Sequence, residues 1–363
     1  MPTILTVIGT RPQYLKYAAI AAHAPLPYHD VLIDTGQHYD AALSTQFMRE
    51  YSIPAPEVTL AAEERYGLPR LASLLTQLGP LCRKYRPDGI LCFGDTDSTL
   101  AAALTAVRHG IPLFHVEAGE RSRDMNGTRL HPAATPEESN RVTVDHLSSL
   151  LLCTTEEAVD NLDAELTGGD AVRTGDIMYD LFLRAHDHLP SRRDLQHRLG
   201  ITSGTYALCT VHRAINTDDP RRLQSLLDTL SDFPLPVYLP LHPRTEARMK
   251  EAGIAPRESA LHFLPPLPHR DVLGLMQGAH KVLTDSGGLT REAYFSGIPS
   301  ICLDDATAWH ALCESGWCSL TGCDPQRIHE AMSREPDREA DPSAFGDGMA
   351  AGRVIEELRD FFR

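Results

Sequence analysis

Two acidic residues, Asp95 and Glu117, each stand at the end of a short apolar run. Asp95 follows 89-GILCFG-94, and Glu117 lies near the end of 113-LFHVEAG-119. Apolar runs of this length are typical of buried strands, and ligands bind outside the carboxyl ends of strands in open parallel sheets. We therefore expect the two carboxylates to converge on one pocket, where they could act on a bound ligand.

The first apolar run ends in 9-GTRPQYLK-16, a segment that could bind an anion. Gly9 permits a tight turn, Pro12 suits the first position of a helix, and a helix N-terminus favours anions. Arg11 and Lys16 would add positive charge there. A plain strand–helix turn with basic surface residues is the alternative interpretation. Because the chain contains neither a P-loop nor a G-x-G-x-x-G motif, ATP-dependent phosphoryl transfer and a Rossmann-type NAD site are disfavoured.

A second candidate for phosphate binding is 284-TDSGGLTREA-293. Ser286, Gly287 and Gly288 open a helix there, and backbone amides beside glycine can approach phosphates closely. Glu292 lies one turn into this helix and could accept hydrogen bonds from ribose hydroxyls. A glycine-rich helix cap is the alternative interpretation.

Two histidines of the second half, His212 and His242, also end apolar runs. A lone histidine is more often structural than functional. Each of these is followed closely by an arginine, Arg213 and Arg244 respectively, which makes an anion site more plausible.

The elements that must position these residues alternate between strand and helix patterns. The expected strands are 3–9, 31–36, 89–94, 113–119, 150–155 and 171–176 in the first half, and 206–213, 236–243, 261–266, 281–288 and 300–305 in the second. Such alternation predicts an α/β protein with parallel sheets covered by helices on both faces. The alternation restarts after the polar stretch 181–200, so we expect two doubly wound, Rossmann-like domains. A last helix with Val354, Leu358 and Phe361 on one face should pack on one of them.

Composition narrows the class of protein. The formal charge of the 363-residue chain is −15, and it lacks a cluster of basic residues, so we expect no nucleic-acid partner. Its eight cysteines form no C-x-x-C pair, so we expect no metal site but buried free thiols in a reducing cytoplasm. We expect neither a signal peptide nor a membrane span, because the N-terminus lacks a basic region and no apolar stretch approaches about 20 residues.

Taken together, these motifs resemble the non-hydrolysing UDP-N-acetylglucosamine 2-epimerase family. The matching segments run in the family's order over nearly the whole chain: 9-GTRPQYLK-16, 35-TGQHYD-40, 94-GDTDSTLAAAL-104, 115-HVEAGERS-122, 136-PEESNR-141, 145-DH-146, 174-TGDIMYD-180, 211-VHRAINTDD-219, 242-HPRT-245, 284-TDSGG-288 and Glu292-Ala293.

The resemblance implies a glycosyltransferase-B-like fold with its active site in the interdomain cleft. The expected domains are 1–180 with the catalytic acids, 181–345 with the UDP site, and 346–363 as a helix that returns to the first domain. We also expect a UDP-N-acetylhexosamine substrate, no cofactor and a homodimer.

Site residues carried over by motif fall into three sets. The catalytic set is Asp95, Glu117, Glu137 and His212. The UDP and phosphate contacts are Arg11, Lys16, Arg141, Ser286, Gly287, Gly288 and Glu292. A second, activating UDP-N-acetylglucosamine would contact Gln37, Arg213 and His242.

The chemistry of such an enzyme explains the need for carboxylates. The C2 hydrogen of UDP-N-acetylglucosamine has no adjacent carbonyl and is not acidic. If UDP departs first, or nearly so, C1 becomes oxocarbenium-like and the C2 proton becomes acidic. One carboxylate can then remove that proton to give 2-acetamidoglucal, another acid can protonate C2 from the opposite face, and UDP can return to C1.

The sequence also departs from the family pattern. Ile215 replaces the usual glutamate of a His-Arg-x-Glu-Asn motif, Asp304 replaces an arginine, and the segment between Arg121 and Pro136 is longer than usual. We predict a UDP-N-acetylglucosamine 2-epimerase. The alternatives are a 2-epimerase of a modified UDP-sugar such as a diacetamido-uronic acid, a glycosyltransferase of the same fold, and a non-catalytic nucleotide-sugar sensor.

Overall fold

The computed structural model describes residues 1–36, 48–61, 67–201, 204–255, 257 and 260–363, and the chain divides into two compact units. The first unit comprises 1–121, 130–183 and 343–363; the second comprises 122–129 and 184–342. This division differs from the expected ranges mainly at 122–129. The reason is an antiparallel pair between β6 (Arg123–Asp124) and β14 (Ala306–Thr307), which joins that segment to the second unit.

The first unit is built around a parallel sheet in the order β3-β2-β1-β4-β5-β7-β8. Its strands are β1 (Thr3–Ile8), β2 (His29–Asp34), β3 (Val58–Thr59), β4 (Gly89–Phe93), β5 (Leu113–Ala118), β7 (Leu150–Cys153) and β8 (Asp170–Arg173). Its helices are α1 (Arg11–Ala21), α3 (Gly67–Tyr85), α4 (Asp97–His109), α5 (Pro136–Leu147), α6 (Glu156–Glu165) and α16 (Ala350–Phe361); α7 (Ile177–His186) begins in it.

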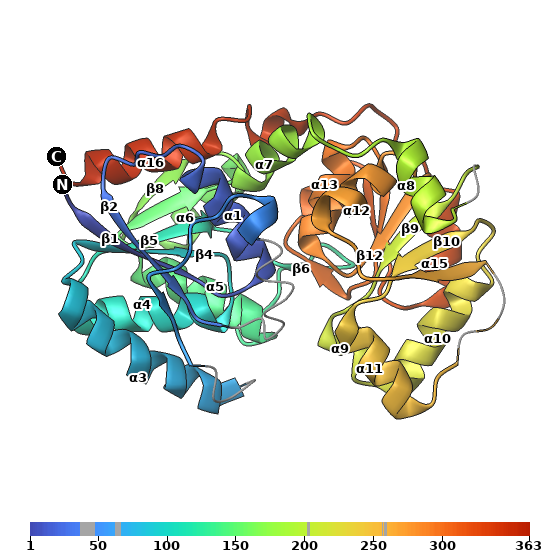
Figure 1. Ribbon diagram of the computed structural model, residues 1–363, viewed down its shortest axis with the longest axis horizontal. Coiled ribbons are helices and arrows are strands. Elements are labelled where there is room, and N and C mark those ends of the chain that lie inside the picture. The colour runs from blue at the N-terminus through green and yellow to red at the C-terminus, as the bar shows by residue number, and fades with distance from the viewer. Residues whose placement is uncertain (37–47, 62–66, 202–203, 256, 258–259) are drawn as a thin grey trace. The chain divides into compact units, whose positions relative to one another are not determined.

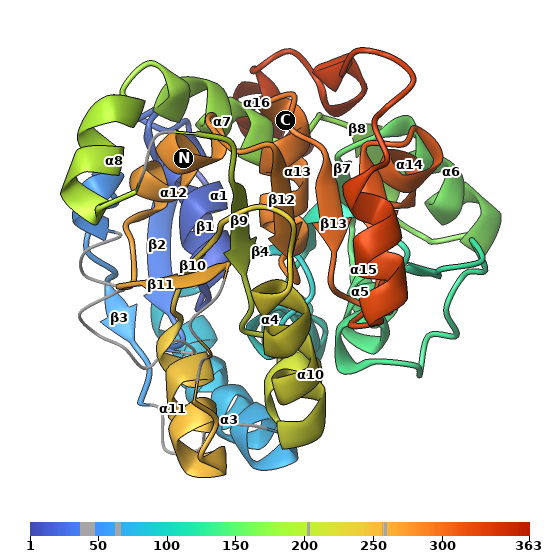
Figure 2. The same cartoon turned by 90° about the vertical axis from the view of Figure 1, so that its right-hand side faces the viewer.

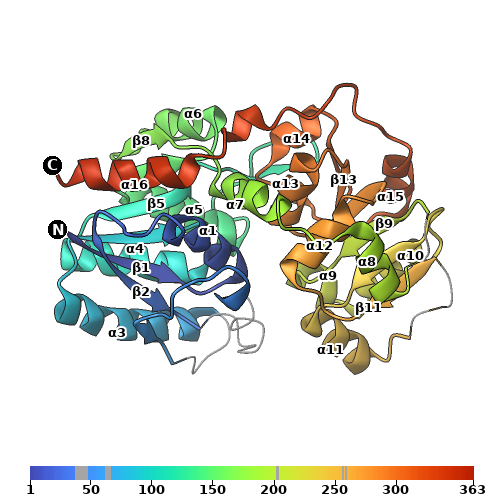
Figure 3. The same cartoon turned by 45° about the horizontal axis from the view of Figure 1, so that its top comes forward.

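Helices cover both faces of this sheet, as its largely apolar central strands require. One face packs on α3 and α4 through residues such as Leu78 and Ala102. The other packs on α1 and α16 through Ile20 and Val354. Figures 1 and 3 show α16 beside α1, so the final helix lies against the first unit.

The second unit has a parallel sheet in the order β11-β10-β9-β12-β13-β15. Its strands are β9 (Ala207–Thr210), β10 (Val237–Pro240), β11 (Leu261–Leu264), β12 (Lys281–Thr284), β13 (Ser300–Cys302) and β15 (Cys318–Leu320). Its helices are α8 (Arg192–Leu199), α9 (Ala214–Thr217), α10 (Pro220–Ser231), α11 (Pro243–Ala252), α12 (His269–Met276), α13 (Gly287–Phe295), α14 (His310–Glu314) and α15 (Pro325–Met332), with a 3-10 turn η1 (Pro342–Phe345) at its end.

This second sheet is also covered on both faces. Leu226 of α10, Met249 of α11 and Ile328 of α15 pack on one face, and α8, α12 and α13 lie on the other (Figure 2). The sequence-based expectation of two doubly wound, Rossmann-like α/β domains is therefore confirmed, and each of the expected strands is present.

The turn after β1 shows how the sequence brings the strand ends of the first unit together. Gln13 accepts hydrogen bonds from the backbone N–H groups of Gly9 and Thr10, and donates to the carbonyl of Phe93 at the end of β4. Gly9 is required for space, because a Cβ atom there would lie 1.8 Å from the Thr35 hydroxyl. One buried amide thus fixes α1 against the end of β4.

Candidate functional site

Asp95 and Glu117 lie at the carboxyl ends of β4 and β5, which are neighbours in the sheet. Gly94, at φ 62°, turns the chain out of β4 and places Asp95 beyond its end. Glu117 has φ 69° and coincides with a register shift between Val116 and Ala118 in the pairing of β5 with β7. A bulge of this kind changes the direction of a side chain.

Lys16 reaches this edge of the sheet from α1. Its ammonium lies 2.7 Å from the Glu117 carboxylate, and the two side chains are only 4% and 12% exposed. Gly94 makes room for the pair, since a Cβ there would lie 3.4 Å from Lys16 Nζ and 3.7 Å from Glu117 Oε1. Lys16 was predicted as a phosphate contact; here it neutralises a candidate base. Arg11, the first residue of α1, is half-buried.

Helix α5 brings its own charged residues to the same edge. Thr135 caps it by accepting a hydrogen bond from the N–H of Glu138, and Pro136 occupies its first turn. Within this helix Glu137 is exposed, whereas Glu138 is fully buried. The sequence motif named only Glu137, because two adjacent glutamates cannot be told apart without knowing which face of the helix is covered.

Arg141 connects the buried glutamate to the end of β4. Its guanidinium donates to a carboxylate oxygen of Asp95, and to Glu138 at 2.6 Å. Burial alone would lower the pKa of Arg141, but the carboxylates of Asp95 and Glu138, and more weakly Glu117, raise it above its ordinary value. Arg141 is therefore a permanent cation that places its positive charge directly against Asp95.

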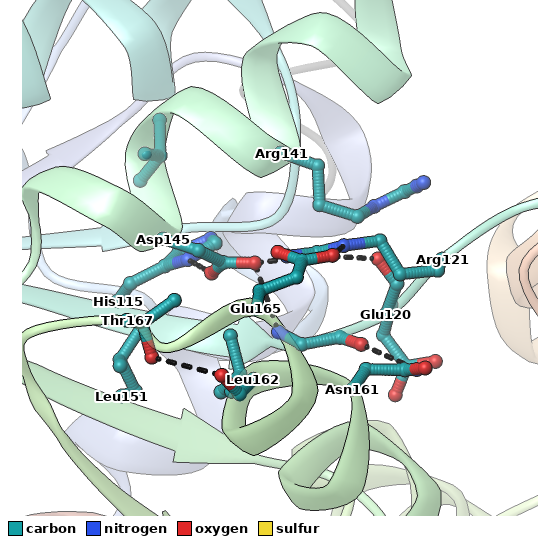
Figure 4. Close-up of polar contacts among 12 residues, drawn as sticks. His115, Glu120, Arg121, Arg141, Asp145, Leu151, Asn161, Leu162, Glu165 and Thr167 are labelled. Atoms are coloured by element: carbon teal, nitrogen blue, oxygen red, sulfur yellow. Dashed lines mark hydrogen bonds and ion pairs between the residues drawn. The ribbon is translucent and has the colours of Figure 1, made fainter. Parts of the chain in front are cut away.

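A network of charged and polar side chains that was not predicted surrounds the fully buried His115 and Asp145. His115 of β5 contacts Asp145 of α5, and Arg121 bridges Asp145 and Glu165 (Figure 4). The sequence did contain a signal for His115 and Asp145, because both residues fall within segments that match the family. Neither stands at a strand end, so neither was assigned a role.

In the second unit, Asp285 organises the loop after β9. Its carboxylate accepts hydrogen bonds from the backbone N–H groups of His212 and Arg213, and from the side chain of Asn216. The ring of His212 is 3.2 Å from the same carboxylate and about two-fifths exposed. Asp285 therefore fixes His212 at the carboxyl end of its strand.

The N-terminus of α13 is the candidate phosphate site. Ser286 caps it by accepting a hydrogen bond from Leu289, and Gly287 and Gly288 form the first helical turn, whose N–H groups have no partner within the helix. Gly287 also has little spare room, since a Cβ there would lie 3.0 Å from the indole nitrogen of Trp309.

Glu292, one turn further along α13, is buried, and it lies 2.8 Å from the ring of His269. The arrangement fixes the carboxylate of Glu292 in one orientation. Its partner His269, at the start of α12, was not predicted, because the two residues are separated by 23 positions.

Two of the three residues expected to bind an activating second sugar make contacts within the second unit. Gln37 is outside the described residues. Arg213 donates to the carboxylate of Asp304, and His242 caps α11 by accepting a hydrogen bond from the N–H of Arg244. The rings of His212 and His242 are 5.4 Å apart. Ile215, which replaces a glutamate of the family pattern, is 45% exposed.

Among the described residues, no three histidine, cysteine or acidic side chains are grouped as a metal site would need. None of the described helices combines the length and apolar character of a membrane span.

The glycosyltransferase-B-like pair of Rossmann domains, with acids in one and a glycine-rich helix N-terminus in the other, defines a nucleotide-sugar type of enzyme. A family model described as UDP-N-acetylglucosamine 2-epimerase matches residues 22–359. The chain belongs to this family, and the predicted class of enzyme, an isomerase, is confirmed.

Individual relatives cover the chain from end to end. A UDP-2,3-diacetamido-2,3-dideoxy-D-glucuronate 2-epimerase from Pseudomonas aeruginosa is 34% identical and aligns with 98% of this chain and 99% of its own. A UDP-N-acetylglucosamine 2-epimerase homolog from Methanococcus maripaludis is 33% identical with the same coverage. The crystal structure of the Methanocaldococcus jannaschii UDP-GlcNAc 2-epimerase, in complex with UDP-GlcNAc and UDP, is 29% identical, covers 98% of each chain and has a TM-score of 0.86.

Proposed function

We propose that this chain interconverts UDP-N-acetylglucosamine and UDP-N-acetylmannosamine by inverting C2. The observation that carries the proposal is the set of carboxylates in the first unit. The chain that contains them belongs to the 2-epimerase family. Asp95 and Glu117 end neighbouring strands, and Glu137 lies in the first turn of the helix that contacts Asp95.

The reaction consists of an elimination and its reversal. Loss of UDP from C1, with loss of the C2 proton to a carboxylate, leaves 2-acetamidoglucal. Protonation of C2 on the opposite face and return of UDP to C1 complete the inversion. Each proton transfer by a positioned group contributes about 10²–10⁴-fold in rate.

The first unit supplies the groups for proton transfer. Lys16 pairs with Glu117 and Arg141 pairs with Asp95, so each of these two carboxylates lies against a positive charge. The low exposure of Lys16 and Glu117 limits the screening of their pair by water. Glu137 is exposed on α5 and available to substrate. The two transfers are assigned to this set of three acids.

The second unit supplies the contacts for UDP. The first-turn amides of α13, at Gly287 and Gly288, suit the diphosphate, and negative charge builds up there as UDP leaves C1. Glu292, held by His269, suits the ribose hydroxyls. His212, fixed by Asp285, completes the proposed catalytic set.

A modified UDP-sugar is the second candidate substrate. It is favoured by the 34% identity to the Pseudomonas aeruginosa protein, whose name specifies a diacetamido-glucuronate. The elimination would be the same, since both sugars carry an acetamido group at C2. The two candidates differ in the groups at C3 and C6, so a substrate comparison separates them.

The test is incubation in heavy water with each UDP-sugar separately. The C2-epimerised product should carry deuterium at C2, and UDP with the matching glycal should accumulate slowly. A C2-epimerised product without deuterium, formed also from C2-deuterated substrate without loss of its label, would refute the elimination. Turnover of the diacetamido sugar alone would move the substrate to the second candidate, and no turnover of either would refute both.

We also propose a cytoplasmic homodimer. All eight cysteines, each within the described part of the chain, are free thiols, which fits a reducing compartment. The dimer follows from the family resemblance alone. Sedimentation of the purified protein at several concentrations tests it, and a monomer at micromolar concentration would contradict it.

A further inference from the structure

His115 is fully buried in β5 with both ring nitrogens facing oxygen acceptors. Its Nδ1 is 2.7 Å from the carboxylate of Asp145, and its Nε2 is 2.7 Å from the backbone carbonyl of Gly94. Figure 4 shows the contact with Asp145 beside the guanidinium of Arg121. A neutral imidazole has only one N–H and could donate to only one of these oxygens.

The state of Asp145 decides how the ring is protonated. Its other oxygen accepts hydrogen bonds from Arg121 at 2.6 Å and from the N–H of Gly119 at 3.1 Å. Burial alone would raise the pKa of Asp145, but the bond and charge of His115 and the charge of Arg121 lower it below its ordinary value. Because this carboxylate already accepts from Arg121 and Gly119, it presents an acceptor to Nδ1, just as the Gly94 carbonyl does to Nε2. Both contacts are satisfied as hydrogen bonds only when both nitrogens of His115 carry hydrogen.

Charged groups of both signs lie around this ring. Asp145 from α5 and the partly exposed Glu165 from α6 are acidic, and Arg121, after β5, is basic. Cys92 on β4 adds no charge, because burial and the nearby Asp145 raise the pKa of its thiol. A charged imidazole therefore does not leave an uncompensated charge in the interior.

These hydrogen bonds tie together the three segments that carry the proposed acids. Gly94 directly precedes Asp95, His115 lies two residues before Glu117, and Asp145 belongs to the helix whose first turn contains Glu137. The same helix holds Asp95 through its backbone carbonyl, which accepts from Asn140 at 3.0 Å.

We propose that His115 is a positioning residue whose two ring nitrogens both donate hydrogen bonds, and that it fixes the carboxylates of Asp95, Glu117 and Glu137 relative to one another. The kinetic part rests on the proposed epimerisation; the protonation state does not. Since the diphosphate and ribose contacts proposed on α13 belong to the second unit, loss of His115 should reduce turnover and leave substrate binding largely intact. A misplacement of about 1 Å lowers turnover by about 100-fold.

The protonation state can be measured without any activity. The full-length protein, labelled with ¹⁵N in its 17 histidines, is compared with H115Q so that the His115 signals are assigned by difference. Both ring nitrogens should show the chemical shifts of N–H groups at neutral pH. A single protonated nitrogen at neutral pH would overturn the proposal.

Kinetic measurements then show whether loss of His115 misplaces the catalytic groups or only destabilises the fold. H115Q can donate toward only one of the two acceptors, so we expect kcat to fall by about 100-fold with KM nearly unchanged. H262Q alters an exposed histidine of the second unit, and V354A opens a space in the core of the first unit. Both should retain the wild-type kcat per folded molecule.

Two outcomes contradict the kinetic part. H115Q could lose turnover only in proportion to its folded fraction, as V354A would, or its KM could rise while kcat is unchanged. An inactive wild type would instead refute the proposed function, and the nuclear magnetic resonance result would still decide whether His115 is an imidazolium.

Discussion

Replacement of Glu117 by glutamine tests the central acid of the proposed mechanism and its ion pair at once. A glutamine side chain has nearly the shape of glutamate but cannot accept a proton at neutral pH. Loss of one proton-transfer group should lower turnover by about 10²–10⁴-fold. Because Lys16 is buried, the same change also leaves an ammonium without its counter-charge.

The cost in stability follows from the geometry of the pair. Two unit charges 2.7 Å apart attract by about 6 kcal/mol at an effective dielectric constant of about 20. Removal of one partner from a buried pair costs about 3–5 kcal/mol. Since Glu117 is 12% exposed and the glutamine oxygen can still accept from Lys16, we expect the lower end, about 3 kcal/mol. For a domain of this size that lowers Tm by about 6–12 °C.

The double variant K16M/E117Q separates the two effects. It removes both charges, so the melting temperature should return most of the way to the wild-type value, while turnover should stay as low as in E117Q. Thermal melts and product analysis by anion-exchange chromatography measure both quantities. If folded E117Q turned over within tenfold of the wild-type rate, Glu117 would have no role in proton transfer. An unchanged Tm would show that the ion pair does not stabilise the fold.

Activation of the reverse reaction by added UDP-N-acetylglucosamine should be weak or absent, because Ile215 has no polar group for a second sugar. With UDP-N-acetylmannosamine as the substrate, a strong rate increase on addition of UDP-N-acetylglucosamine would contradict this. Cys313 should be the first thiol to react with Ellman's reagent. Only Cys313 and Cys323 among the eight cysteines, all of which are described, are half-buried rather than buried, and burial raises the pKa of Cys323 to about 11. The variant C313S should therefore lose the fast phase of the reaction. The lowered pKa of Asp145 contributes stability that is complete above the ordinary aspartate value and lost as pH falls. The difference in unfolding free energy between wild type and D145N should therefore shrink below about pH 4; a constant difference would refute the ionised carboxylate.

Most of the fold could be predicted because its signals are local. Each expected strand is an apolar run closed by glycine or polar residues, and it appears within a few residues of its predicted bounds. The two-residue strands β3, β6 and β14 could not be found this way, because two residues carry no periodicity. The docking of 122–129 onto the second unit depends on pairing between positions more than 180 residues apart.

The candidate site was predictable in its positions but not in its pairings. Strand ends and glycine turns in the sequence indicate Asp95, Glu117 and the start of α13. The partner of Lys16 could not be inferred, because the ion pair joins residues a hundred positions apart through two different elements. The same holds for His115 and Asp145, which look like ordinary buried-strand and helix positions until their contacts are known.

The backbone at Glu117 shows how these pairings support the chemistry. A non-glycine residue in the left-handed region costs about 1–3 kcal/mol, and Glu117 adopts φ 69°. The strain is held from both sides: the carbonyl of Val116 accepts from Gly94, and the N–H of Gly119 donates to Asp145. The carboxylate is thereby turned out of the strand and toward Lys16. Asp145, itself bound by His115, thus fixes the direction of a candidate catalytic group that it does not contact directly in any of the described hydrogen bonds.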